Sequence, residues 1–240
     1  MAREPLTVES IQSLIGETVY DPYGRILGKL VSFESDVDGT VSSIVVETEA
    51  RDVKFYPAPH VEVKDGRVVV QPEWRILSDQ VIASYQRALR RLKGLEDMYS
   101  RNEVPASVYH EFRKKLDASL AKLRSEASKL KTMLSQRMRE IEDANLRLDR
   151  AIASLKVSYL AGEVGEKQYK LAIENLRSAK DSYSKELDDL KRVKSRLESL
   201  EAGSLEVLKR EEKEQESTEA PEQQMPIHGI QPIPVKVLEG

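Results

Sequence analysis

The side chains that most often catalyse reactions or bind metals are few and scattered in this sequence. Its histidines are His60, His110 and His228, and it has no cysteine. No two histidines share a motif, and no glycine-rich loop with a lysine opens a predicted helix. Aspartate and glutamate are abundant, but on heptad helices they usually solubilise the surface or pair between helices. We therefore expect no enzyme activity, no metal site and no cofactor.

The last sixteen residues, 225–240, carry a clearer chemical pattern. Apolar residues alternate there with prolines and a lysine: Pro232, Ile233, Pro234, Val235, Lys236 and Val237. This alternation is typical of a strand that adds to an exposed sheet edge, where the backbone supplies hydrogen bonds and alternate side chains fill pockets. Residues 203–224 before it are too polar to offset the entropy of ordering, so we expect a disordered acidic linker. A partner-binding peptide is the favoured interpretation of 225–240, and folding back on the chain's own barrel is the alternative.

Charge is distributed unevenly along the 240 residues. Residues 1–77 hold 8 basic and 13 acidic residues, whereas residues 87–139 hold 14 basic and 6 acidic residues. Such a basic surplus could bind DNA or anionic lipid, although long helices often carry many basic residues simply on solvated faces. The candidate phosphate-binding residues are Arg87, Arg90, Arg91, Lys93, Arg113, Lys114 and Lys115.

Residues 1–77 are expected to form a small all-β barrel of five or six short strands. Turn sequences separate the apolar runs, among them Asp21-Pro22-Tyr23-Gly24, Asp36-Val37-Asp38-Gly39 and Asp65-Gly66. The pattern Ile15-Gly16, Val19-Tyr20-Asp21, Gly24, Ile26-Leu27-Gly28-Lys29-Leu30 and Asp38-Gly39 resembles the PRC-barrel domain. Trp74 is expected to fill the junction with the first helix, which Ser78 or Asp79 would cap.

Residues 78–202 are predicted to form three antiparallel helices over about 78–100, 106–160 and 166–202. An internal repeat marks the turns between them: Tyr99, Glu103, Val104 and Tyr109 recur as Tyr159, Glu163, Val164 and Tyr169 at an offset of 60. The middle helix would be about 80 Å long. Its apolar residues follow a heptad pattern: Leu116, Leu120, Leu123, Ala127, Leu130, Leu134, Ile141, Leu148 and Leu155. Because one hairpin would leave such a stripe exposed, we expect self-association through this seam.

The order of parts resembles the archaeal cell-division protein A (CdvA) family, in an α+β chain with a barrel, a coiled coil and a terminal peptide. The resemblance implies a non-enzymatic scaffold that forms filaments at the division site and recruits the ESCRT-III-like protein CdvB to the membrane. It also implies possible association with DNA. The residues that match the family's CdvB-binding peptide are Ile227, Ile230, Ile233, Val235, Val237 and Leu238.

An RNA- or ribosome-binding assembly factor with a PRC barrel is the alternative function. That class would favour a basic barrel, whereas residues 1–77 are net acidic. No signal-like segment opens the chain, and no run of eighteen apolar residues occurs in it. We therefore expect a cytoplasmic protein, at mid-cell if the resemblance holds, that is peripheral to the membrane and has no transmembrane segment.

Overall fold

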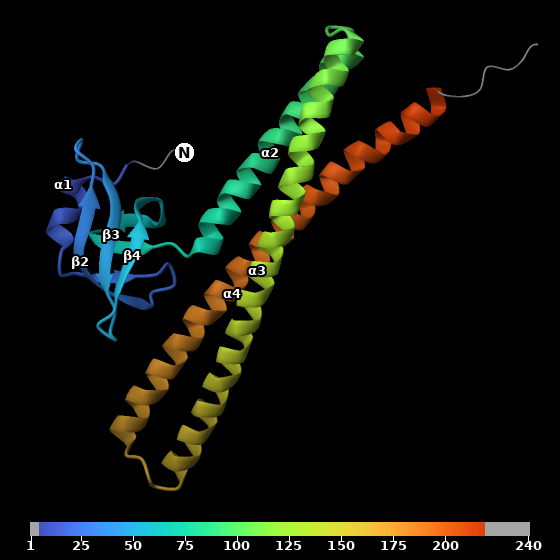
Figure 1. Ribbon diagram of the computed structural model, residues 1–240. Coiled ribbons are helices and arrows are strands. Elements are labelled where there is room, and N and C mark those ends of the chain that lie inside the picture. The colour runs from blue at the N-terminus through green and yellow to red at the C-terminus, as the bar shows by residue number, and fades with distance from the viewer. Residues whose placement is uncertain (1–4, 219–240) are drawn as a thin grey trace, which may run out of the picture. The chain divides into compact units, whose positions relative to one another are not determined.

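The computed structural model describes the backbone of residues 5–218 and the side chains of residues 5–203 (Figure 1). The chain divides into two units, Met1–Ala202 and Gly203–Gly240. The first unit is α+β, as predicted: a six-stranded sheet comes first and long helices follow. The predicted peptide 225–240 lies outside the described residues.

The sheet is built from six short strands, which confirms the upper of the two strand numbers predicted. They are β1 Thr18–Tyr20, β2 Ile26–Ser35, β3 Val41–Glu47, β4 Val53–Pro57, β5 Val61–Lys64 and β6 Arg67–Val70. Their order in the sheet is β4-β3-β2-β1-β6-β5, and only the β1–β6 pair is parallel. Two short elements, α1 (Val8–Ile11) with η1 (Gln12–Leu14), precede β1, and η2 (Ala58–His60) precedes β5.

Alternation along the strands places the apolar side chains on one face. The buried core of the sheet consists of Ile11, Val19, Leu30, Val41, Ile44, Val46, Val61, Val68 and Val70. Gly28 is required where β2 lies close to β3, because its φ is +149° and a Cβ there would lie 2.1 Å from the carbonyl oxygen of Glu47. The β1–β2 register also shifts at this point, as in a bulge that tightens the sheet.

The helical part consists of α2 (Glu73–Ser100), α3 (Ala106–Leu160) and α4 (Glu166–Thr218). The limits predicted for the middle helix are confirmed. α2 starts five residues before Ser78, because Pro72 supplies the extended residue at its N-terminus and Glu73 opens its first turn. Ser78 is instead buried inside the helix, where its hydroxyl donates to the carbonyl oxygen of Trp74, and Trp74 is itself buried.

α4 also extends beyond its predicted end at residue 202. It continues to Thr218, so that residues 203–218 are helical, whereas the sequence analysis expected disorder for 203–224. Leucine, lysine and glutamate are good helix formers, and this propensity opposes the polarity on which the expectation of disorder rested.

The internal repeat corresponds to two turns with the same structure. In the first, Glu103 and Asn102 donate backbone hydrogen bonds to the carbonyls of Met98 and Tyr99; in the second, Glu163 and Gly162 donate to Ser158 and Tyr159. Both pairs form the Schellman pattern that ends a helix, with Asn102 or Gly162 at positive φ. The tyrosines stack across each turn, with ring centroids 4.1 Å apart for Tyr99 and Tyr109 and 4.2 Å apart for Tyr159 and Tyr169.

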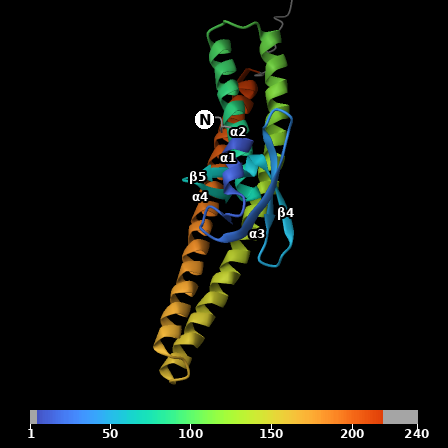
Figure 2. The ribbon, with the colours of Figure 1, turned by 90° about the vertical axis from the view of Figure 1, so that its left-hand side faces the viewer.

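The heptad seam of α3 is buried along its central part within a single chain. Figures 1 and 2 show α3 beside α2 on the way to the first turn and beside α4 on the way to the second. The buried seam residues of α3 are Leu120, Leu123, Ala127, Leu130, Leu134 and Ile141. Leu116, Leu148 and Leu155 are only half-buried. The expectation that one hairpin leaves the whole stripe exposed is therefore wrong for Leu120–Ile141, because α2 and α4 both pack against the same long helix.

Candidate functional site

The predicted phosphate-binding residues gather at one end of the α2–α3 hairpin. Arg87, Arg90, Arg91 and Lys93 lie on α2, and their side chains are exposed. Residues 113–115 lie on α3, which runs antiparallel to α2 and so returns past this stretch. Both basic groups therefore lie on the α2–α3 hairpin, and their binding of phosphate stays a prediction.

Arg113 is the exception within this basic group. Its side chain is buried, and its guanidinium lies 3.0 Å from Oε1 of Glu96 and 3.1 Å from Oδ1 of Asp117. Arg113 therefore joins α2 to α3 instead of facing solvent, and its assignment to the phosphate-binding surface is corrected. Lys115 is exposed and pairs with Glu111 at 2.6 Å, an exposed i,i+4 pair that contributes little.

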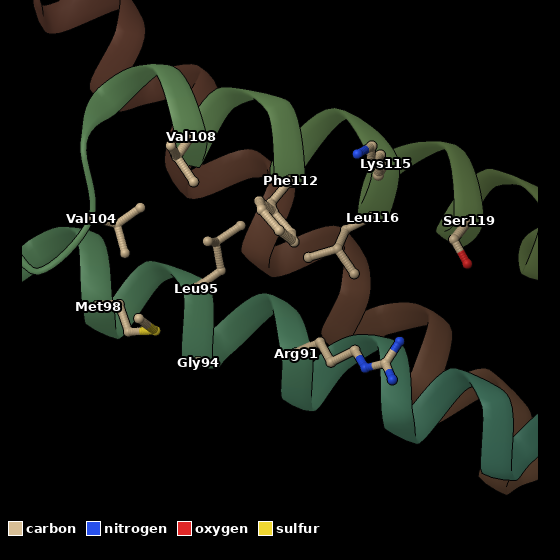
Figure 3. Close-up of a pocket in the computed structure, with 10 residues that line it drawn as sticks. All are labelled: Arg91, Gly94, Leu95, Met98, Val104, Val108, Phe112, Lys115, Leu116 and Ser119. Carbon is tan, nitrogen blue, oxygen red and sulfur yellow. The ribbon is translucent and has the colours of Figure 1, made fainter.

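An apolar groove of about 690 Å³ lies between α2 and α3 beside the exposed cations. In Figure 3, Phe112 and Leu116 on α3 face Leu95 on α2, and Val104 closes the end at the turn. Phe112 is 51% exposed although it is one of the largest apolar side chains of the helices. Arg91 and Lys115 lie on the rim, so the groove can accept an apolar surface that carries acidic groups; this first-turn groove comprises Leu95, Met98, Val104, Val108, Phe112 and Leu116.

The second turn exposes apolar side chains without a comparable cluster of aromatic and sulfur-containing residues. Val157, Leu160 and Leu171 are 67%, 83% and 63% exposed. Glu163 in the turn and Glu166 at the start of α4 are exposed as well. We call Val157, Leu160 and Leu171 the second-turn knobs. They are apolar, and the charges beside them have both signs: Glu166 pairs with Lys170 at 2.5 Å, and Lys156 and Lys167 are exposed.

A buried ionic cluster anchors the β1–β2 turn to the helices. Glu186 on α4 is 1% exposed; its carboxylate lies 2.6 Å from Arg25 of the turn and 2.8 Å from Arg137 of α3. Burial alone would raise the pKa of Glu186, but hydrogen bonds and charge from Arg137 and Arg25 outweigh it and lower the pKa. Glu186 is therefore an ionised link between three elements.

Tyr23 adds a second link between the same turn and α4. Its hydroxyl donates to Oδ2 of Asp189 at 3.2 Å, and its carbonyl oxygen accepts from the Ser182 hydroxyl at 2.9 Å. Arg75 of α2 lies 3.1 Å from Oδ2 of Asp189. Burial, and then the nearby charge of Asp189, raise the pKa of Tyr23. The sequence identified Asp21–Gly24 only as a turn. No motif in these four residues indicates contacts with Ser182 and Asp189, which lie more than 150 residues away in the chain.

The remaining predicted sites are treated only as far as the structure describes them. Ile227, Ile230, Ile233, Val235, Val237 and Leu238 all lie outside the described residues. Within the described part, no group of three or more His, Asp or Glu side chains is placed to hold a metal ion. No helix described there combines the length and hydropathy that a membrane span requires.

A small β domain joined to long antiparallel helices, with exposed apolar side chains at the helical turns, defines a class of coiled-coil proteins. The family model of the CdvA-like coiled-coil domain matches residues 73–220. Over 202 residues the chain is 37% identical to Cell division protein A of Sulfolobus acidocaldarius, and the match covers 84% of each chain. The chain belongs to the CdvA family.

Proposed function

We propose that the chain is a non-enzymatic scaffold of archaeal cell division that self-associates into filaments and recruits the ESCRT-III-like protein CdvB to the membrane. The observation that carries this proposal is the similarity to Cell division protein A over 84% of both chains. The structure adds two turns, at opposite ends of α3, with exposed apolar side chains. A rod with a binding surface at each end is suited to assembly.

Self-association is assigned to these turns because they carry exposed apolar side chains, whereas the central part of the heptad seam of α3 is buried. Leu130 and Leu134 are 4% and 0% exposed within one chain, so they offer no surface to a second copy. The first-turn groove is apolar and has Arg91 and Lys115 on its rim, whereas the second-turn knobs are exposed apolar side chains with charges of both signs beside them. Docking of the knobs of one copy into the groove of the next is a heterologous contact, and such contacts propagate into open filaments when the rotation does not close.

Contact with a membrane is peripheral in this proposal. The exposed cations Arg87, Arg90, Arg91, Lys93 and Lys114 support electrostatic attraction to phosphate groups, on anionic lipid or on DNA. Arg113 takes no part, because its charge is held by Glu96 and Asp117.

Recruitment of CdvB is assigned to residues 225–240. The alternating Ile233, Val235 and Val237 support strand addition to an exposed sheet edge on the partner. Burial of each such side chain is worth about 1.5–3 kcal/mol before the cost of ordering the peptide. The side chain of Lys236, which has the opposite parity, would then face away from these three.

Calorimetric titration of CdvB with the full chain tests this assignment. Val235→Asp should weaken binding at least about tenfold, because a charge replaces a buried apolar contact. Lys236→Ala is the matched control and should bind within about twofold of the unaltered chain. A chain that ends at Gln224 should not bind. Equal affinities for Val235→Asp and the unaltered chain would contradict strand addition, and undiminished binding by the shortened chain would contradict recruitment by this segment.

A further inference from the structure

The sheet is open at β5, which is its terminal strand. In the order β4-β3-β2-β1-β6-β5, β5 pairs with β6 alone among the strands of residues 5–218. The two strands are joined by Asp65 and Gly66, which have φ of 50° and 71°, the conformation of a tight type I′ hairpin. The outer edge of β5 thus has no partner strand within residues 5–218, and the hairpin fixes the register of β5 with β6.

The hydrogen-bond alternation identifies which backbone groups of β5 face outwards. The backbone N–H of Gln71 donates to the carbonyl oxygen of His60. The opposite residues that exchange hydrogen bonds between the two strands are therefore 60/71, 62/69 and 64/67. Residues 61 and 63 therefore direct their backbone groups away from β6. The N–H of Val61 already bonds to Ala58, which leaves the carbonyl of Val61 and both backbone groups of Val63 for another strand.

A groove of about 930 Å³ runs beside this edge. Pro5 and Leu6 of the N-terminal segment, Val41 of β3, and Val61 and Val63 of β5 supply its apolar lining. Val61 is buried, and Val63 packs against the core of the sheet. A strand added to β5 would therefore find hydrogen-bonding groups and an apolar surface on the same side.

In the chain's own terminal segment, the residues whose backbone groups can pair fully alternate in the same way as the outward-facing residues of β5. In an extended strand, residues 233, 235 and 237 direct their backbone groups to one edge, and 232, 234 and 236 to the other. Pro232 and Pro234 have no N–H, so only the edge formed by 233, 235 and 237 can pair fully. Residues that face each other across a ladder share a sheet face. Pairing with Val61 and Val63 would thus place Ile233, Val235 and Val237 on the core face, over the groove.

We propose that residues 232–238 of this chain dock as an added strand on the outer edge of β5. The prolines leave the new outer edge without donors at two positions, so the added strand would end the sheet. Because the same residues are assigned to CdvB, docking on β5 and binding to CdvB would exclude each other. The inference needs only this chain, so it does not depend on the recruitment proposed above.

Amide hydrogen exchange of the full chain, with no CdvB present, tests the docking. The Val63 amide should exchange at least about tenfold more slowly in the full chain than in a chain that ends at Gln224. Val63→Pro removes the outward N–H at an edge position that tolerates proline, and it should abolish the protection of residues 233, 235 and 237. Val53→Pro is the matched control at the opposite edge, because the N–H of Val53 on β4 also faces outwards, and it should leave that protection unchanged.

Two results would overturn the inference: identical exchange of Val63 with and without residues 225–240, or unchanged protection of those residues in Val63→Pro. Cross-linking in mixtures of isotopically light and heavy chains assigns the donor strand. Purely intramolecular products place it in the same molecule, whereas mixed products place it in a second copy, and either result supports docking on β5. Failure here would leave the CdvB titration unaffected, since that experiment measures a different edge.

Discussion

The two helical turns have the same backbone structure but different surfaces. Both end a helix with the same pair of hydrogen bonds and stack two tyrosines across the connection. At the offset of 60, Phe112 of the first turn corresponds to Ala172 of the second. Of the other groove positions, Met98 corresponds to Ser158 and Val108 to Gln168, whereas three are unchanged: Leu95, Val104 and Leu116 correspond to Leu155, Val164 and Leu176. The repeated motif therefore determines where the chain reverses, whereas the residues around it determine what the turn can bind.

The contacts between the two helices that flank each turn also differ. Buried Arg113 of the first turn pairs with Glu96 and Asp117, and it corresponds to the buried Ile173 of the second. The positions equivalent to Glu96 and Asp117 are Lys156 and Arg177. The helices next to the first turn are thus joined by ion pairs, and those next to the second turn by an apolar contact. The second turn has cations at the positions where the first has carboxylates.

The largest expected effect comes from transferring the arginine to the second turn. Ile173→Arg would bury a charge near Lys156 and Arg177 with no carboxylate at the equivalent positions, and should lower the free energy of unfolding by about 3–5 kcal/mol. Denaturant unfolding measures the change. Leu171→Arg, at an exposed position two residues away, should alter it by less than about 0.5 kcal/mol. A loss below about 1 kcal/mol for Ile173→Arg would show that the second turn accommodates charge as the first does.

A smaller effect is expected at the residue that reverses the second turn. Gly162 has φ of 76°, so Gly162→Ala should lower the free energy of unfolding by about 1–2 kcal/mol through backbone strain. Gly94→Ala is the control, because Gly94 lies inside α2 with open space around it and no positive φ; it should stabilise the chain by up to about 1 kcal/mol. Changes of opposite sign in the free energy of unfolding of the two variants would support the shared turn structure, and changes of the same sign would contradict it.

Local patterns predicted most of the fold. The glycine turns marked the strands, and Pro105 and Gly165 marked the start of two helices. The repeat located both reversals of the chain. Heptad periodicity identified the buried face of α3, but the period is the same whether the partner helix belongs to the same chain or to another. For that reason the burial of Leu130 and Leu134 within one chain could not be predicted.

The contacts that the sequence did not reveal are those between distant charged or polar groups. Arg113 belonged to a basic stretch, and its partner Glu96 is on another helix, so counting charge could not identify the pair. Tyr23 and Asp189 meet only because the β1–β2 turn reaches α4. Neither residue belongs to a motif, and a hydrogen bond of such long range leaves no periodic signal.

In the assembly proposed above, copies bind head to tail, with the second-turn knobs of one copy in the first-turn groove of the next. Sedimentation of two variants and their mixture tests it most directly. Phe112→Lys disables the groove and Leu171→Lys disables the knobs; both positions are exposed, and lysine is a good helix former. Each variant alone should be monomeric, whereas an equimolar mixture should form dimers and no longer species, because each variant keeps one intact surface. Filaments from either variant alone, or a mixture that stays monomeric, would contradict the claim.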